Sequence, residues 1–202
     1  DIAKRYVPGN QKIEIVILEE KRPGKIFALE QAVPYIQTEF VIFGDADTVY
    51  PPDFITVASE LFEKLPEEYG ALLAIGKYGD AGSFGNSIYA WGKVIWSKLL
   101  PKKCHSGGYG QVFRTEDFIK CGGYHSKYWK FVLMDHEIIH RFHKVSKTYY
   151  HPALWVSTSD RRTNRKNVRW NTWEQILYLL TPFRWEDWFF YSFFTKKLEQ
   201  RN

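Results

Sequence analysis

The stretch FVIFGDAD, residues 40–47, joins an apolar run to two aspartates, Asp45 and Asp47. A short apolar run that stops at a glycine is typical of a buried β-strand. Side chains two residues apart on an extended segment point to the same face, so both carboxylates are expected to project together beyond the strand. In an open α/β sheet, that end of the strand is where ligands bind. Paired carboxylates there favour Mg²⁺ or Mn²⁺ carrying a diphosphate, whereas a turn cap beside a solvated carboxylate is the alternative.

Strands and helices alternate on both sides of this stretch. Strands are expected at residues 12–18, 40–43, 71–75 and 148–156, with a short one after the glycine-rich turn at residues 106–110. Helices are expected at residues 25–36, 53–65, 86–100 and 134–145. This alternation predicts an α/β fold, with a mostly parallel sheet flanked by helices.

Composition limits the kind of protein this is. The chain has 202 residues, of which 45% are hydrophobic and 25% charged, as in one globular domain. A formal net charge of +5 favours an anionic partner. The two cysteines, Cys104 and Cys121, are too few for a disulfide framework, which favours a reducing, cytoplasmic setting. No apolar run reaches the roughly 18 residues of a spanning helix, so we expect a protein that is soluble or peripheral to a membrane.

Further motifs follow in a fixed order along the chain. They are RPGK at residues 22–25, DAD at 45–47, GGYG at 107–110 with GGY at 122–124, and DHEIIHRF at 135–142. Together they resemble the inverting, nucleotide-sugar-dependent glycosyltransferases of family 2, which have the Rossmann-like GT-A fold. The resemblance implies a catalytic domain over residues 1–165 and a separate aromatic, basic helical extension over residues 166–202. The family's first strand has no counterpart here, so we expect an N-terminally incomplete catalytic domain.

The resemblance implies a reaction and a donor side. A sugar would move from a nucleoside diphosphate sugar, with a UDP-sugar favoured, to an acceptor hydroxyl with inversion. Asp45 and Asp47 would bind Mn²⁺ or Mg²⁺, which neutralises the departing diphosphate. Lys25 and Arg162 would face the diphosphate together with Asp45. Arg162 belongs to a basic stretch, residues 161–169, which would otherwise be a solvated loop or an anion-binding patch.

The resemblance also implies an acceptor side. An attacking hydroxyl has to lose its proton, which requires a positioned carboxylate. Asp135 is implied in this role, with the N-terminal end of a helix stabilising its anion, and helix capping is the structural alternative. The acceptor would be bound by Gly107, Gly108, Tyr109 and Glu137. Sugars and lipid-linked or cell-envelope compounds are the acceptors we expect.

Other functions stay open on the sequence alone. The segment HEIIH, residues 136–140, matches the zinc peptidase motif, in which two histidines bind the metal and Glu137 is the base. Against it, His143 stands where the longer metzincin pattern has glycine. A non-catalytic sugar- or nucleotide-binding relative is a further alternative. Nucleic acid is a disfavoured partner, because no nucleic-acid fold motif accompanies the basic stretch.

The C-terminal segment FRWEDWFFYSFF, residues 183–194, is followed by Lys196 and Lys197. Aromatic residues with basic flanks are typical of a segment at a membrane surface. We therefore expect it at an anionic membrane surface, on the inner face of the membrane. The alternative is a helix that packs on the catalytic domain or on a partner protomer.

Overall fold

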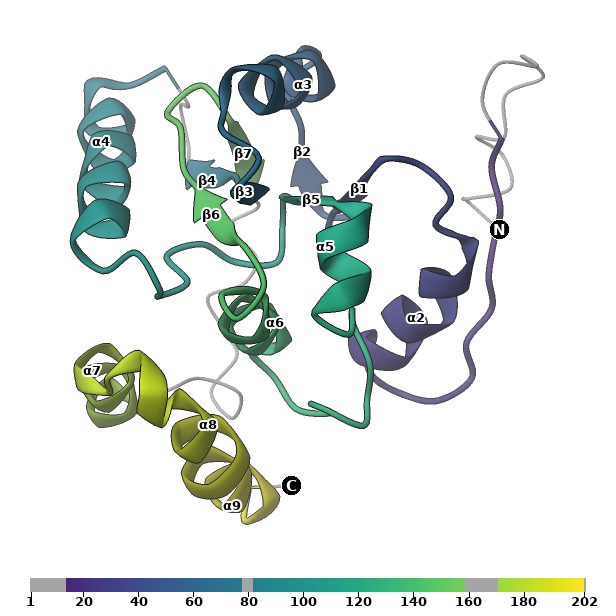
Figure 1. Ribbon diagram of the computed structural model, residues 1–202, viewed down its shortest axis with the longest axis vertical. Helices are drawn as coiled ribbons and strands as arrows, with labels where there is room; N and C mark the ends of the chain where they lie inside the picture. The colour runs from purple at the N-terminus through teal and green to yellow at the C-terminus, as the bar shows by residue number, and fades with distance from the viewer. Residues whose placement is uncertain (1–13, 78–81, 159–170, 202) are drawn as a thin grey trace.

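The structure is a computed structural model that describes residues 14–77, 82–158 and 171–201 (Figure 1). Within these residues, helices cover two short sheets, and a second group of helices follows towards the C-terminus. The predicted α/β class, with sheets flanked by helices, is therefore confirmed.

The first sheet has the strand order β1-β5-β3-β6. These strands are β1 (Phe40–Phe43), β5 (Gln111–Arg114), β3 (Tyr69–Leu73) and β6 (Lys147–Tyr149). β5 runs antiparallel to both of its neighbours, whereas β3 and β6 are parallel. In this register Val41 and Ala71 both lie opposite Phe113.

The second sheet has the strand order β2-β7-β4, formed by β2 (Thr48–Val49), β7 (Trp155–Thr158) and β4 (Ile75–Lys77). β7 is antiparallel to β2 and parallel to β4. The chain passes from the first sheet to the second at Ala74. Its N–H donates to the carbonyl of Gly110 at 2.9 Å, and the next N–H, of Ile75, donates to the carbonyl of Leu154 at 2.9 Å.

The mixed strand directions correct the expectation of a mostly parallel sheet. β5 enters the sheet at Gly110 and runs against β1 and β3, a direction that strand–helix alternation does not determine. Residues 14–18, expected as part of a strand, form none. The strand expected at residues 148–156 is divided into β6 and β7, because the loop between them contains Pro152, which has no N–H to donate to a ladder.

The helices agree with the expected positions to within a few residues. Those beside the sheets are α2 (Lys25–Ala32), the 3₁₀ turn η1 (Val33–Tyr35), α3 (Phe54–Lys64), α4 (Phe84–Leu99), α5 (Thr115–Lys120) and α6 (Met134–Phe142). The C-terminal group comprises α7 (Thr172–Leu180), the 3₁₀ turn η3 (Phe183–Trp185), α8 (Glu186–Trp188), the π-helical η4 (Phe189–Phe194) and α9 (Thr195–Glu199). Within the described ranges, no helix combines the length and apolarity needed to cross a membrane.

The first sheet is buried on both faces. Successive side chains of a strand point to opposite faces, so Leu72 and Leu73 of β3 enter different cores. Leu72 packs with Phe62 of α3, and Leu73 packs with Phe118 of α5 and Phe142 of α6. This explains why the strand sequences read as apolar runs rather than as alternating patterns.

A third core holds the C-terminal helices against the loop that precedes α6. Phe189, Phe190 and Phe194 are fully buried around Trp129, whose ring centroid lies 5.5 Å from that of Phe190. Three of the aromatic residues of this segment are thus core residues, as in the packing alternative, whereas Trp185 and Trp188 are 54% and 46% exposed. Figure 1 shows this helical group beyond α6, at one end of the molecule.

Candidate active site

The two aspartates of the DAD motif lie on a turn directly after β1. The Thr48 N–H donates to the Asp45 carbonyl at 3.2 Å, so the chain folds back here instead of continuing the extended strand that was expected. Asp47 is exposed on this turn and Asp45 is half-buried. Strand β2 begins at Thr48, so in the sequence the two aspartates lie between β1 of the first sheet and β2 of the second sheet.

Asp45 forms an ion pair with Lys25, which comes from a distant part of the sequence. Lys25 is the first residue of α2, and Gly24 precedes it with a φ of 129°. Residues with side chains rarely adopt this φ, so the glycine of the RPGK motif permits the turn that brings Lys25 to the aspartate. The structure therefore unites two of the residues expected on the donor side.

Tyr50 fixes this turn to the glycine-rich loop. The Asp45 N–H donates to the Tyr50 hydroxyl at 3.0 Å, and that hydroxyl donates to the Tyr109 carbonyl at 2.8 Å. A methyl group on Gly76 would lie 2.7 Å from the Tyr109 hydroxyl, so the small residue makes room for this ring. Tyr50 was not among the residues expected from the sequence, because a tyrosine near an aspartate pair carries no motif of its own.

Asp135 lies beside Gly108 in the first turn of α6. A methyl group on Gly108 would lie 3.4 Å from Asp135 Cβ and 3.6 Å from Lys25 Nζ. The helix starts after Leu133, whose φ of 64° is left-handed, an unusual conformation for a leucine. The Gln111 side-chain amide donates to the Asp135 carbonyl at 3.4 Å. The expected base and the cation that pairs with Asp45 thus both lie next to Gly108.

Glu137 is not on the acceptor side, and that prediction is wrong. Its carboxylate is 1% exposed and accepts hydrogen bonds from the Arg141 guanidinium at 2.6 and 3.0 Å and from the Tyr191 hydroxyl at 2.5 Å. Arg141 in turn donates to the carbonyls of Cys121 and Gly123 at 2.7 and 2.9 Å. The Glu137–Arg141 pair therefore ties α6 to the Gly-Gly turn and to η4, and has a structural role.

The histidines of the HEIIH segment do not form a zinc site in the structure. His140 is buried, and its two ring nitrogens lie 2.8 Å from Glu186 and 2.7 Å from Asp187, both in α8. Glu137, the base in the peptidase motif, forms an ion pair with Arg141. Within the described part of the chain, no three or more His, Cys, Asp or Glu side chains are arranged to hold a metal ion.

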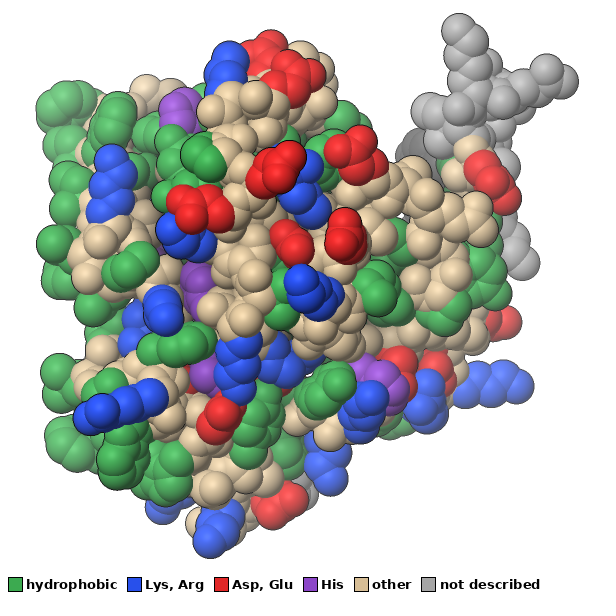
Figure 2. Space-filling model, viewed as in Figure 1, with side chains coloured by type: hydrophobic (Ala, Val, Ile, Leu, Met, Phe, Trp, Pro, Cys, Tyr) green, Lys and Arg blue, Asp and Glu red, His purple; other side chains and the backbone are tan. Residues whose placement is uncertain are grey.

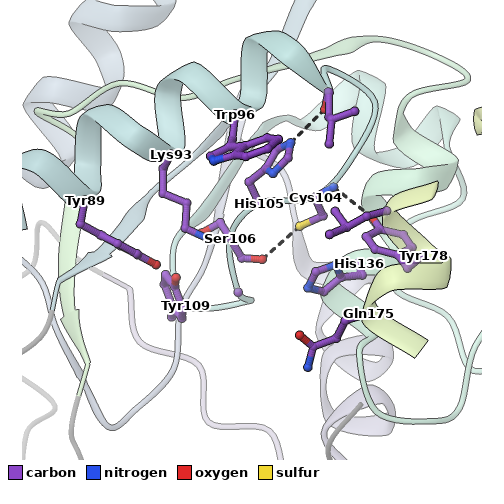
Figure 3. A pocket seen from close by; sticks show the side chains of 13 residues that line it. Tyr89, Lys93, Trp96, Cys104, His105, Ser106, Tyr109, His136, Gln175 and Tyr178 are labelled. Carbon is purple, nitrogen blue, oxygen red and sulfur yellow. Dashed lines mark hydrogen bonds between the residues drawn. The ribbon is translucent and has the colours of Figure 1, made fainter. Parts of the chain in front are cut away.

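A cavity of about 530 Å³ adjoins the site on the other side of the glycine-rich loop (Figure 3). Gly107, Tyr109 and His136 line it, together with Cys104, His105 and Ser106. Tyr89, Lys93 and Trp96 of α4 form one wall, and Gln175, Tyr178 and Leu179 of α7 form the opposite one. The side chains from α4 and α7 were not expected in a site, because they approach each other only through the tertiary fold.

Burial favours the neutral forms of three groups that line this cavity. Burial lowers the pKa of His136 and of His105, and burial raises the pKa of the Cys104 thiol. The Cys104 thiol donates to the Ser106 carbonyl at 3.0 Å, and His105 lies 2.9 Å from the Leu100 carbonyl. Lys93 provides the ammonium group on the α4 wall. The cavity therefore offers aromatic faces and hydrogen-bonding groups to a neutral or anionic ligand.

Asp45 and Asp47 fit a divalent ion that arrives with its substrate. Mg²⁺ and Mn²⁺ are often bound through one or two carboxylates, with substrate phosphates and water completing the shell. Asp45 already lies against a cation, the Lys25 ammonium, so positive charge is stabilised at this point. Arg162 and the rest of the basic stretch at residues 161–169 lie outside the described residues.

Comparisons with known proteins show the family and the fold of the chain. The family model of glycosyl transferase family 2 matches residues 1–122. Among solved structures, the chain is similar to the mannosyltransferase PcManGT from Pyrobaculum calidifontis in complex with GDP-Man and Mn²⁺, with a TM-score of 0.54 and 18% identity. That match covers 80% of this chain and 43% of the mannosyltransferase, so the chain spans less than half of that protein's length. At this identity the likeness shows the GT-A fold alone.

A mycobacterial protein of known crystal structure gives a weaker match, with a TM-score of 0.30 and 19% identity over 50% of this chain and 33% of that protein. No curated protein matches the chain. The family model covers more than half of the residues, and its range includes Lys25, the DAD motif and the glycine-rich loop. The chain belongs to glycosyl transferase family 2.

Proposed function

We propose that this protein transfers a sugar from a nucleoside diphosphate sugar to an acceptor hydroxyl, with inversion at the anomeric carbon. The observation that carries the proposal is the position of Gly108, where an added methyl group would contact both Asp135 and Lys25, the cation that pairs with Asp45. A base and a site for a diphosphate thus lie close together beside one small residue. Because one fold hosts many activities, the fold alone does not determine the reaction. The reaction class is supported by family membership together with the residues of the site.

Asp45, Asp47 and Lys25 would bind the donor. Mn²⁺ or Mg²⁺ held by the two aspartates would neutralise charge on the departing diphosphate as a Lewis acid. Lys25 adds a second positive charge on the same side. The mannosyltransferase of similar fold was solved with GDP-Man and Mn²⁺, which supports a nucleotide-sugar donor and a divalent ion. Our sequence expectation favours uridine as the base, so UDP- and GDP-sugars are both to be tested.

Asp135 acts as the base in this proposal. The acceptor oxygen attacks the anomeric carbon, the bond from that carbon to the diphosphate oxygen breaks, and the acceptor proton passes to the Asp135 carboxylate. One displacement at one carbon inverts its configuration. The acceptor would enter from the cavity beside Gly107 and Tyr109, which suits a sugar or a lipid-linked, cell-envelope acceptor.

The substitution Asp135→Asn tests this assignment. We expect turnover to fall by about 10²- to 10⁴-fold, the usual contribution of a general base, while the nucleoside diphosphate binds as before. Transfer is followed by release of the nucleoside diphosphate, and NMR of the product gives the anomeric configuration. Asp53→Asn is the matched control, since Asp53 is exposed and its side chain caps no helix.

Three results would contradict the proposal. Near-normal turnover of Asp135→Asn would remove Asp135 as the base. Retention of the anomeric configuration would exclude the single displacement. Loss of nucleotide binding in the same variant would show that Asp135 serves the donor side.

A further inference from the structure

Helix α4 has an apolar stripe that faces away from the protein. Phe84, Ile88, Trp91, Ile95 and Leu99 recur at intervals of three and four residues, which places them on one side of the helix. They are between 56% and 81% exposed. The opposite side of α4 is buried through Ala90 and Val94, so the helix has enough core contact to be held in place without the stripe.

Helix α7 continues this surface. Trp173, Ile176 and Leu180 follow the same spacing and are 65%, 41% and 74% exposed. Lys103, just after α4, fixes the two helices together, because its buried ammonium donates to the carbonyls of Tyr178 and Thr181 at 2.6 and 2.7 Å. Figure 2 shows hydrophobic side chains gathered along the edge of the molecule where α4 and α7 lie. We call these two stripes together the α4–α7 face.

Among the described residues from 82 to 103 and in α7, the exposed charged side chains are basic. Residues 82–103 contain no aspartate or glutamate, and Lys98 and Lys102 are exposed there. The acid of α7, Glu174, is buried and paired with Arg201, whereas Arg184 beyond α7 is exposed. Tryptophan side chains flanked by basic residues favour the boundary between lipid headgroups and acyl chains. Exposed apolar patches of this kind mark interaction sites.

The cavity opens within the α4–α7 face. Tyr89 and Trp96 of α4 and Leu179 of α7 line the cavity and are 39%, 57% and 46% exposed, so they form its mouth. The stripes flank this mouth on the two helices. A surface that covered the stripes would therefore meet the cavity entrance.

We propose that the α4–α7 face binds the surface of an anionic lipid bilayer, with the cavity mouth turned towards the lipid. The apolar stripes enter the boundary region and the lysines contact the headgroups. This assigns membrane contact to α4 and α7 instead of the aromatic C-terminal segment, in which Phe189, Phe190 and Phe194 are buried. The inference does not depend on the proposed sugar transfer, since it requires no donor and no metal.

Co-sedimentation with vesicles tests this inference. The vesicles contain phosphatidylcholine, alone or with phosphatidylglycerol, and the protein carries neither nucleotide nor metal. We expect the unaltered protein to bind the anionic vesicles and to dissociate as salt is raised. The triple variant Trp91→Ser, Ile95→Ser, Leu99→Ser should bind at least about tenfold more weakly, because three apolar contacts are lost. Lys98→Glu with Lys102→Glu should weaken binding by about fivefold or more per lysine.

Matched controls lie on α3, away from the α4–α7 face. Ile55 is 70% exposed, and Lys64 has an exposed side chain. Ile55→Ser and Lys64→Glu should leave vesicle binding unchanged. Circular dichroism and thermal unfolding confirm that every variant is folded, as expected for substitutions of exposed residues.

Four outcomes would overturn the inference. They are no binding of the unaltered protein to anionic vesicles, equal binding by the triple variant, equal loss of binding by the control variants, and a doubled mass in solution that the triple variant abolishes. The last outcome would show that the α4–α7 face joins two copies of the chain. Vesicle binding with no sugar transfer would leave the inference standing and count against the proposed function alone.

Discussion

Gly108 and Asp135 show how single residues determine the site. Asp135 and the Lys25 ammonium both lie beside Gly108, and a larger residue there would fill the space next to these two groups. Asp135 and Glu137 are two residues apart on α6, yet Glu137 points into the core. The DHEIIHRF motif indicated that this helix contributes to the site, but it could not show which of the two acids faces the site and which faces the core. Tyr191, which binds Glu137, lies 54 residues further along the chain.

The substitution Gly108→Ala tests the space between these charged groups. The added methyl group would make ordinary contacts of 3.4 Å or longer, so we expect the protein to fold with nearly unchanged stability. It would occupy the gap beside Asp135, and turnover should fall by about 10- to 100-fold, as for a small misplacement of reacting groups. Measurement of transfer rate and of the thermal unfolding midpoint checks both statements.

Gly92→Ala is the control for this substitution, because a methyl group on Gly92 meets nothing within 4 Å. Alanine in the interior of α4 should stabilise the protein by roughly 0.5–1 kcal/mol and leave turnover unchanged. Full activity of Gly108→Ala would show that no substrate passes between Asp135 and Lys25.

Helix α6 connects the site to the core at the scale of elements. Its first turn carries Asp135, and its far end packs Phe142 into the core. Arg141 ties it to the Gly-Gly turn, and His140 ties it to α8. The sequence predicted this helix and its start at residue 134 because the apolar spacing is regular. It could not predict the contacts with α8, which depend on how the C-terminal helices fold back.

Burial of histidine on α6 predicts a pH-dependent stability. Burial lowers the pKa of His143 from 6.5 to about 4. Below pH 6.5 the unfolded chain binds a proton that the folded protein does not bind until about pH 4, so the free energy of unfolding falls as the pH drops through this range. The slope is at most about 1.4 kcal/mol per pH unit for such a residue. Lowered pKa values of His136 and His105 act in the same direction.

Urea unfolding at pH 7, 6 and 5 measures this effect. This pH range lies above the ordinary pKa values of most carboxylates, so their titration contributes little. We expect the unaltered protein to lose stability steadily over these steps, and His143→Gln to lose less, because glutamine does not titrate. Equal pH dependence of the two proteins would mean that the pKa of His143 is the same in the folded and the unfolded protein.

At the scale of the whole molecule, the sequence indicated the fold class through local patterns. Apolar runs that end in glycine or acidic residues gave β1 and β3, and helical spacing gave α3 and α4. The direction of β5 and the division of residues 148–156 into two strands in separate sheets were not predictable. Both follow from the position of Gly110 and Leu154 beside Ala74 and Ile75, which are contacts between distant segments.

In the site, too, the residues within sequence motifs were predicted, whereas the contacts between distant segments were not. Lys25, Asp45, Gly108 and Asp135 were expected from motifs, and the structure brings them together. The cavity walls on α4 and α7 were not expected, because the buried Lys103 joins these helices across more than 70 residues of sequence. The arrangement of the C-terminal helices thus completes a site that begins in the first 50 residues.

The central claim is that Asp45 and Asp47 bind a nucleoside diphosphate through a divalent ion. Calorimetric titration of UDP and of GDP, with Mn²⁺ and with EDTA, tests it most directly. We expect binding of one nucleotide with Mn²⁺ that is at least about tenfold weaker, or about 1.4 kcal/mol, in EDTA and in Asp45→Ala/Asp47→Ala. Asp53→Ala should bind normally. Equal affinity in EDTA, equal affinity in the double variant, or no binding of either nucleotide would contradict the claim.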